Sequence, residues 1–133
     1  MPLNYLDDSN GVNPYKVLNK LYSIEYDNKI SIGSGGSIVT NLWHMIGIKN
    51  NDRFIHSSQG DMGFELPSSI GCQIAEPNKK VLCIVGDGSF QLNIQELQTI
   101  VHYKLPIKIL LFVSRLIRSF GLCSLISESV GLK

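Results

Sequence analysis

VLCIV-GDGSF, residues 81–90, is the stretch that decides the fold of this chain. Its apolar first half, bounded by glycine, predicts a buried strand. The two glycines of the second half let the backbone bend sharply and approach a ligand closely. Asp87, between those glycines, then stands at the carboxyl end of a sheet. Carboxylate oxygens are ligands for Mg²⁺, which takes its other ligands from phosphate oxygens and water. The stretch therefore predicts a site for a metal ion bound to phosphates.

Strands and helices alternate on either side of this stretch. Short strands are predicted at 29–32 and 53–56, and a second buried strand at 107–113. Helices are predicted from Pro14 to about residue 22, over 38–46, from near Pro67 to the residues before Pro77, and over 94–101. The apolar faces predicted for the last two helices are Ile70, Ile74 and Ala75, and Ile94, Leu97, Ile100 and Val101. This alternation predicts an α/β domain with a parallel sheet covered on both faces, whose ligands bind at the carboxyl ends of the strands.

The bulk composition limits the classes of function. The 133 residues allow one domain, and a formal charge of +1 gives no field that would favour nucleic acid or an anionic membrane. No apolar run is long enough to span a bilayer, and the N-terminus lacks the features of a signal peptide. The three cysteines form no CxxC pair, so neither a zinc site nor a disulfide scaffold is indicated, and Cys83 is expected to be a small buried hydrophobe. A cytoplasmic domain fits these features.

The glycine-rich segments admit a structural and a functional interpretation. The loop GSGGS at 33–37 either makes a tight turn from a strand to a helix or cradles a diphosphate with backbone N–H groups. Asp87 either caps a helix or turn, or binds a metal. The dinucleotide fingerprint GxGxxG fails at both loops, because Ile38 and Gln91 stand where the last glycine is required. Neither loop has the lysine of a P-loop.

Three blocks of sequence together resemble the thiamine-diphosphate enzymes, and most closely their acetolactate-synthase-like branch, which condenses 2-oxo acids. GDGSFQLNIQELQT at 86–99 is similar to the family's diphosphate-binding signature. GDMGFELPSSIG at 60–71 is similar to the branch's block G-x-M-G-x-x-L-P-A-A-I-G, and LPIKI at 105–109 matches the strand that closes the motif. The resemblance covers residues 14–112 and implies the family's three-layer parallel-sheet fold, incomplete at the C-terminus. Residues 1–13 then form a leader or linker, and residues 113–133 an atypical tail.

The resemblance implies thiamine diphosphate and Mg²⁺ as cofactors and assigns roles by position. Asp87 is implied as the first Mg²⁺ ligand, and Met62 as the bulky apolar side chain that holds the cofactor bent. By itself, Met62 could equally fill a gap in a core. His56 and Glu65 match no catalytic position: His56 is expected to end a strand, and Glu65 stands where the family varies. His44 and His102 are expected on helix surfaces. The other cofactor contacts implied are Gly36, Ser37, Gly60, Gly86, Gly88, Ser89 and Phe90.

The chain departs from the family's pattern after Phe112. Ser114 stands at the position of the family's second Mg²⁺ ligand, an asparagine, and serine fits a strict octahedral site less well. A frameshift, an early end of the reading frame or a gene remnant would each produce such a tail. The family's activating glutamate belongs to a separate pyrimidine domain with no counterpart here. No catalytic residue is therefore assigned, and little catalysis is expected from the chain alone.

Three functions follow from the resemblance. The first is the diphosphate-binding domain of an enzyme that acts on 2-oxo acids by decarboxylation and carboligation, working as a homo-oligomer. The second is a non-catalytic remnant, and the third is a split subunit that needs a separate pyrimidine-domain partner. Because the sheet is expected to be incomplete, its 107–113 edge should either be exposed or be covered by the tail. An exposed apolar edge invites aggregation, so the isolated chain is expected to be poorly soluble.

Overall fold

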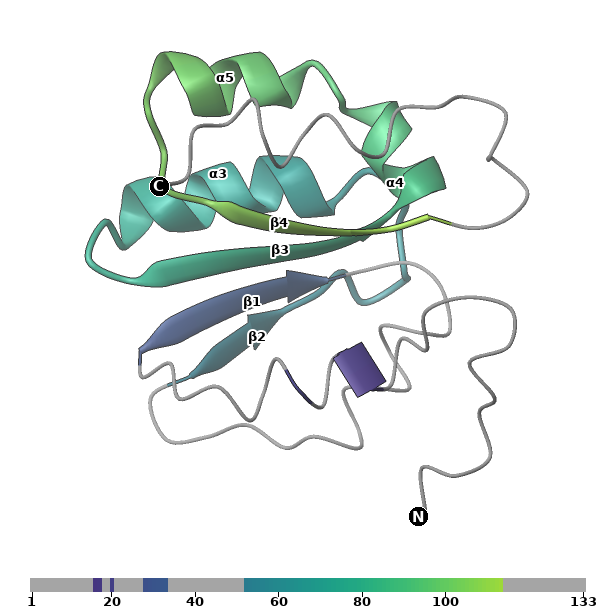
Figure 1. Cartoon of the computed structure of the whole chain (residues 1–133), viewed down its shortest axis with the longest axis horizontal. Helices are drawn as coiled ribbons and strands as arrows, with labels where there is room; N and C mark the ends of the chain where they lie inside the picture. The colour runs from purple at the N-terminus through teal and green to yellow at the C-terminus, as the bar shows by residue number, and fades with distance from the viewer. Residues whose placement is uncertain (1–15, 18–19, 21–27, 34–51, 114–133) are drawn as a thin grey trace.

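A parallel sheet organises the computed structural model, which describes residues 16–17, 20, 28–33 and 52–113 (Figure 1). Its strands are β1 (Lys29–Gly33), β2 (Arg53–Ile55), β3 (Lys80–Gly86) and β4 (Lys108–Phe112). They lie in the order β2-β1-β3-β4, and every neighbouring pair is parallel. The four predicted strands and their parallel arrangement are thus confirmed. The strand over 81–85 gains one residue at each end, because the pairing with β1 starts at Lys80 and the pairing with β4 ends at Gly86.

The helices of the described part are α3 (Glu65–Ala75), α4 (Asp87–Leu92) and α5 (Glu96–His102). Figure 1 shows α3 and α5 on the same side of the sheet, with α4 at its end. Pro67 lies in the first turn of α3, as predicted, and the helix ends before Pro77. Residues 16, 17 and 20 are helical, in agreement with the predicted first helix. The predicted helix over 38–46 lies outside the described residues.

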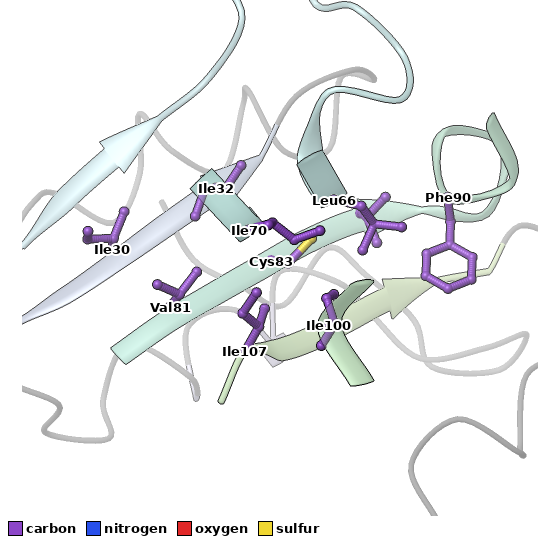
Figure 2. Close-up of a cluster of buried hydrophobic side chains, with 10 residues drawn as sticks. Ile30, Ile32, Leu66, Ile70, Val81, Cys83, Phe90, Ile100 and Ile107 are labelled. Atoms are coloured by element: carbon purple, nitrogen blue, oxygen red, sulfur yellow. The ribbon is translucent and has the colours of Figure 1, made fainter. Parts of the chain in front are cut away.

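The core lies between the sheet and α3. The odd-numbered side chains of β3 point into it, as the alternation of a strand requires, and meet the buried face of α3 (Figure 2). Cys83 is among them, as predicted. The buried cluster consists of Ile30, Ile32, Leu66, Ile70, Val81, Cys83, Val85, Phe90, Ile100 and Ile107. Burial of such side chains contributes about 1.5–3 kcal/mol each, so this cluster fixes the position of the strand ends at which the site lies.

Two predicted apolar faces are only partly buried. Ile74 is 62% exposed and Val101 is 56% exposed, and Ala75 and Ile94 are also exposed. The buried face of α3 is centred near Ser69 and Gln73. Each residue of an α-helix is rotated by about 100° around the helix axis from the residue before it. Ile74 therefore points away from the sheet although it follows Ile70 by one turn.

The second predicted face fails for a different reason. Ile94 lies in the turn before α5, because that helix begins only at Glu96. Within α5 the buried face is formed by Ile100 and the half-buried Leu97, and Val101 lies beyond its edge. The GDGSF segment also differs from the turn expected, because α4 begins directly at Asp87.

β4 forms one edge of the sheet in the described part of the chain. Lys108 is exposed and the other residues of β4 are half-buried, whereas β1 is buried along its whole length. Ile107, which precedes β4, is buried, and the tail from residue 114 onward, the other predicted cover of this edge, lies outside the described residues. No helix among the described residues is long and apolar enough to cross a membrane.

Candidate functional site

The parallel strands bring the loop 56–64 and the start of α4 to the same edge of the sheet. β2 leads into the segment 56–64 before α3, and β3 leads directly into α4. Figure 1 shows α4 beside the segment that enters α3, at the end toward which the strands point. Ligands of parallel sheets bind outside this carboxyl edge. Of the residues predicted for the site, Gly36, Ser37 and Ser114 lie outside the described residues.

Asp87 is the half-buried first residue of α4. Gly86 before it is extended, with φ −86° and ψ 157°, so that the chain passes from strand to helix without an intervening loop. Oδ1 of Asp87 accepts a hydrogen bond from the N–H of Gly88 at 2.9 Å. Asp87 does not cap the helix, because the N-cap of α4 is Gly86 and no side-chain hydrogen bond caps it. The hydrogen bond with Gly88 is compatible with metal binding, because an ionised carboxylate offers about four lone-pair sites on its two oxygens.

Met62 extends from the turn 60–63 toward the GDG segment. It is 57% exposed, which excludes the alternative that it fills a gap in the core. A Cβ built on Gly88 would lie only 3.0 Å from Cε of Met62, so the methyl group rests against this glycine. The contact places an exposed apolar side chain against the residue that follows Asp87. A ligand with apolar rings and a charged diphosphate requires such a combination of groups.

Gly63 ties the loop 56–64 to the segment 89–93. Its N–H donates to Oγ of Ser89 at 2.6 Å, and its carbonyl accepts a hydrogen bond from Nδ2 of Asn93 at 2.6 Å. Its φ is +86°, a conformation that favours glycine. A Cβ at this position would lie 2.8 Å from Nδ2 of Asn93 and 3.2 Å from Cβ of Leu92. The close approach of the two segments therefore depends on a glycine here.

Ser89 and Phe90 face the interior of the protein. Ser89 is 7% exposed, and its hydroxyl donates to Oε2 of Glu65 at 2.5 Å while it accepts the N–H of Gly63. The hydroxyl proton of Ser89 is therefore directed at a carboxyl group and away from the open side of the site. The ring of Phe90 belongs to the buried cluster (Figure 2).

Glu65 has a place in the site that the sequence patterns did not reveal. It is 0% exposed, at the first residue of α3, and its carboxyl group meets Ser89 of α4. Position 65 was expected only to vary within the family. A signal was nevertheless present, because Glu65 stands between Phe64 and Leu66 at the start of an apolar helix face. Glutamate at such a position is almost never fully buried unless it is paired.

Burial also sets the chemistry of the two described cysteines, both of which are free thiols. Removal from water raises the pKa of the Cys83 thiol to about 12; a hydrogen bond with Ser69 opposes this effect, and the charge of Glu65 adds to it. Burial also raises the pKa of Cys72. Both thiols are therefore protonated at neutral pH, and they are poor nucleophiles and poor metal ligands.

The donor set fits a metal that is bound to phosphates. Among the described residues, no three His, Cys, Asp or Glu side chains come close enough together to hold a metal ion. Asp87 offers a single carboxylate, and Mg²⁺ that bridges phosphate oxygens is commonly held by only one or two protein carboxylates. The space next to Gly86 is open, since a Cβ built there would meet no atom within 4 Å. The exposed residue His56 directly follows β2, one residue beyond the strand that it was expected to end, and the exposed residue His102 ends α5 as a helix-surface residue, as predicted. His44 lies outside the described residues.

Comparisons with known proteins agree with this geometry. The family described as "Thiamine pyrophosphate enzyme, C-terminal TPP binding domain" matches residues 34–118. The acetolactate synthase large subunit of Porphyra purpurea is 35% identical over 116 residues, which are 86% of this chain and 19% of the relative. The probable acetolactate synthase large subunit of Methanococcus aeolicus is 36% identical over 110 residues, 78% of this chain and 18% of the relative. The isozyme 2 large subunit of Escherichia coli K12 is 54% identical over 61 residues, 45% of this chain and 11% of the relative.

The chain therefore belongs to the thiamine pyrophosphate enzymes, and the match is to their C-terminal cofactor-binding domain. The predicted family, the α/β fold and thiamine diphosphate as the family's cofactor are confirmed. The match extends to residue 118, beyond Phe112, where the motif resemblance was expected to stop. The chain spans about a fifth of the length of the Porphyra and Methanococcus relatives.

Proposed function

We propose that this member of the thiamine pyrophosphate enzymes binds thiamine diphosphate together with Mg²⁺ at the edge of the sheet where β2 and β3 end. The observation that carries the proposal is the meeting of Asp87 and Met62 at Gly88. The half-buried carboxylate begins α4, and Cε of Met62 lies 3.0 Å from the Cβ position of Gly88. A carboxylate and an apolar side chain thus both contact the same residue, Gly88.

Each residue of the described site has a separate task in this proposal. Asp87 provides an oxygen ligand for Mg²⁺, whose remaining ligands come largely from the diphosphate and water. Gly86 and Gly88 allow the diphosphate to approach the main chain, and Gly60 lets the turn that carries Met62 adopt its φ of +73°. Met62 supports the rings of the cofactor. When bound, the cofactor supplies the carbanion chemistry, and the protein supplies orientation and electrostatics.

The relatives suggest what a complete enzyme would do. Their names give acetolactate synthase large subunits, so we extend the proposal to an enzyme that acts on 2-oxo acids by decarboxylation and carboligation. The described residues provide a cofactor half-site. The proposal therefore includes a pyrimidine domain, contributed by a homo-oligomer or by a separate partner chain.

A non-catalytic remnant is the alternative, and one observation favours it. Ser114 stands where the family has its second metal ligand, and the shorter serine side chain suits an octahedral site poorly. A cofactor-binding domain should bind thiamine diphosphate in a way that depends on Mg²⁺, and a remnant should not. A binding measurement therefore distinguishes the two proposals.

Unfolding of the purified chain by urea, with and without cofactor, tests the proposal. A ligand that binds only the folded state at one hundred times its Kd stabilises by about 2.7 kcal/mol. We expect this stabilisation with thiamine diphosphate and Mg²⁺ together, and none with thiamine and Mg²⁺. Replacing Mg²⁺ by EDTA, or Asp87 by asparagine (Asp87→Asn), should lower it by about 1.4 kcal/mol or more, the effect of a tenfold or greater loss of affinity. Glu76→Gln, which removes one negative charge in the loop after α3, should retain the stabilisation in full. Cooperative unfolding with no stabilisation in the wild type would contradict the proposal and favour the remnant.

A further inference from the structure

Glu65 and Ser89 form a buried pair to which the proposed function gives no task. Glu65 is fully buried and Ser89 nearly so, and 2.5 Å separates Oγ of Ser89 from Oε2 of Glu65. The two residues come from different elements, the start of α3 and the first turn of α4. A carboxyl group removed from water costs free energy unless hydrogen bonds replace its hydration. The presence of the buried Glu65 carboxyl group beside the proposed cofactor site therefore suggests that it helps to organise that site.

The pair lies at the end of a chain of hydrogen bonds that reaches the Met62 turn. The hydroxyl of Ser89 donates a hydrogen bond to Glu65. The oxygen of Ser89 therefore keeps a lone pair that accepts a hydrogen bond from the N–H of Gly63 at 2.6 Å. On the other side, Nδ2 of Asn93 donates to the carbonyl of Gly63 at 2.6 Å. Both backbone polar groups of Gly63 are thus held by the segment 89–93. Met62 directly precedes this fixed residue.

We propose that Glu65 is a positioning residue: through Ser89 and Gly63 it holds the side chain of Met62 against Gly88. The proposal rests on the proposed function, in which Met62 supports the rings of thiamine diphosphate. Asp87 is not a member of this chain of bonds: it follows β3 directly and accepts a hydrogen bond from the N–H of Gly88. We therefore expect the ring-binding half of the site to depend on Glu65, and the metal–diphosphate half not to.

Two probes separate the halves. Inorganic pyrophosphate with Mg²⁺ engages only the metal–diphosphate half, whereas thiamine diphosphate with Mg²⁺ engages both. Glu65→Ala removes the acceptor for Ser89, and Glu65→Gln retains an oxygen acceptor of the same reach. Gln73→Ala is the matched control, because Gln73 is also buried on α3 and its Nε2 is hydrogen-bonded to the carbonyls of Pro77 and Lys79, at the opposite end of the helix.

Titration calorimetry of the folded variants with both probes is the experiment. We expect Glu65→Ala to weaken the binding of thiamine diphosphate about tenfold, the effect of one lost hydrogen bond. Its affinity for Mg²⁺–pyrophosphate should stay at the wild-type value. Glu65→Gln should restore most of the thiamine diphosphate affinity, and Gln73→Ala should change neither affinity. An equal loss for both probes, or no loss for either, would overturn the positioning role.

A ligand-free measurement separates this proposal from the proposed function. With methyl-labelled methionine, the NMR signal of Met62 in the free protein should shift and sharpen in Glu65→Ala, because the released side chain becomes mobile. It should stay unchanged in Gln73→Ala. If the wild type binds neither probe, the proposed function fails, and the Met62 signal still decides the positioning role: an unchanged signal overturns it. Where Glu65→Ala does not fold, Ser89→Ala breaks the same chain of bonds and should give the same results.

Discussion

Two glycines of neighbouring segments, Gly63 and Gly71, have opposite surroundings. Gly63 has a positive φ, and any Cβ there would meet Asn93 and Leu92, whereas Gly71 lies within α3 and a Cβ on it would meet nothing within 4 Å. We expect Gly63→Ala to destabilise the fold by about 1–3 kcal/mol. Gly71→Ala should stabilise it by roughly 0.5–1 kcal/mol, because alanine is the better helix former. Urea unfolding of both variants measures the difference, and a change of the same sign in both would contradict this account.

Cys83 links the stability of the fold to pH. Its thiol pKa is raised to about 12 in the folded chain, so the folded state keeps a proton that the unfolded chain loses from about pH 9 upward. The stabilisation is therefore fully present below pH 9 and decreases between pH 9 and 12, by about 1.4 kcal/mol per pH unit. Chemical unfolding at pH 8 and pH 10 should show a smaller pH-dependent loss in Cys83→Ala than in the wild type. Equal losses in the two proteins would show that this thiol is not the responsible group.

Single residues also show which parts of the site can be predicted from the sequence. Asp87 and Met62 could be proposed because a short motif fixes their neighbours along the chain. The structure brings both into contact with Gly88, and their roles toward the cofactor stay predictions. The pairing of Glu65 with Ser89 was not predicted. It depends on how the starts of α3 and α4 pack against each other, and the two residues are 24 positions apart in the sequence. Local patterns carry no direct signal for such a contact beyond the unusual position of a charged residue in an apolar segment.

At the scale of the elements, strands were predicted better than helix faces. Apolar runs and turn residues mark the strands, and their pairing agrees with the parallel sheet expected from the alternation of elements. The helix faces depend on how each helix is rotated against the sheet. The 3.6-residue period of α3 is compatible with either Ser69 or Ile74 pointing inward, and packing selects the first.

The junction between β1 and β2 contains a buried ion pair that should be important for stability. The register aligns Ile30 with Arg53, so that Lys29 faces Asp52; Nζ of Lys29 lies 3.3 Å from Oδ2 of Asp52, and both side chains are less than one tenth exposed. Removing one partner of a buried pair costs about 3–5 kcal/mol, so Asp52→Asn should lower the free energy of unfolding by that amount. Glu76→Gln, which disrupts the exposed pair with Arg53, should cost less than about 1 kcal/mol. Similar losses in both variants, measured by urea unfolding, would contradict this ranking.

At the scale of the whole molecule, the parallel sheet explains why the site lies where it does. Parallel pairing forces the segments after β2 and β3 to one edge, and the cluster beneath α3 keeps those strand ends fixed. The chain spans about a fifth of the length of its Porphyra and Methanococcus acetolactate synthase relatives. The site described at this edge is proposed as a half-site for the cofactor.

Titration calorimetry of the wild-type chain and of Asp87→Asn with thiamine diphosphate, with and without Mg²⁺, tests the central claim most directly. The account predicts one cofactor bound per chain in the presence of Mg²⁺, and an affinity that falls by about tenfold or more when either the metal or the Asp87 carboxylate is removed. Removing the metal from Asp87→Asn should have little further effect, because the two act through the same bond. Binding that is independent of Mg²⁺ and unchanged in Asp87→Asn, or a folded wild-type chain that binds no cofactor, would contradict it.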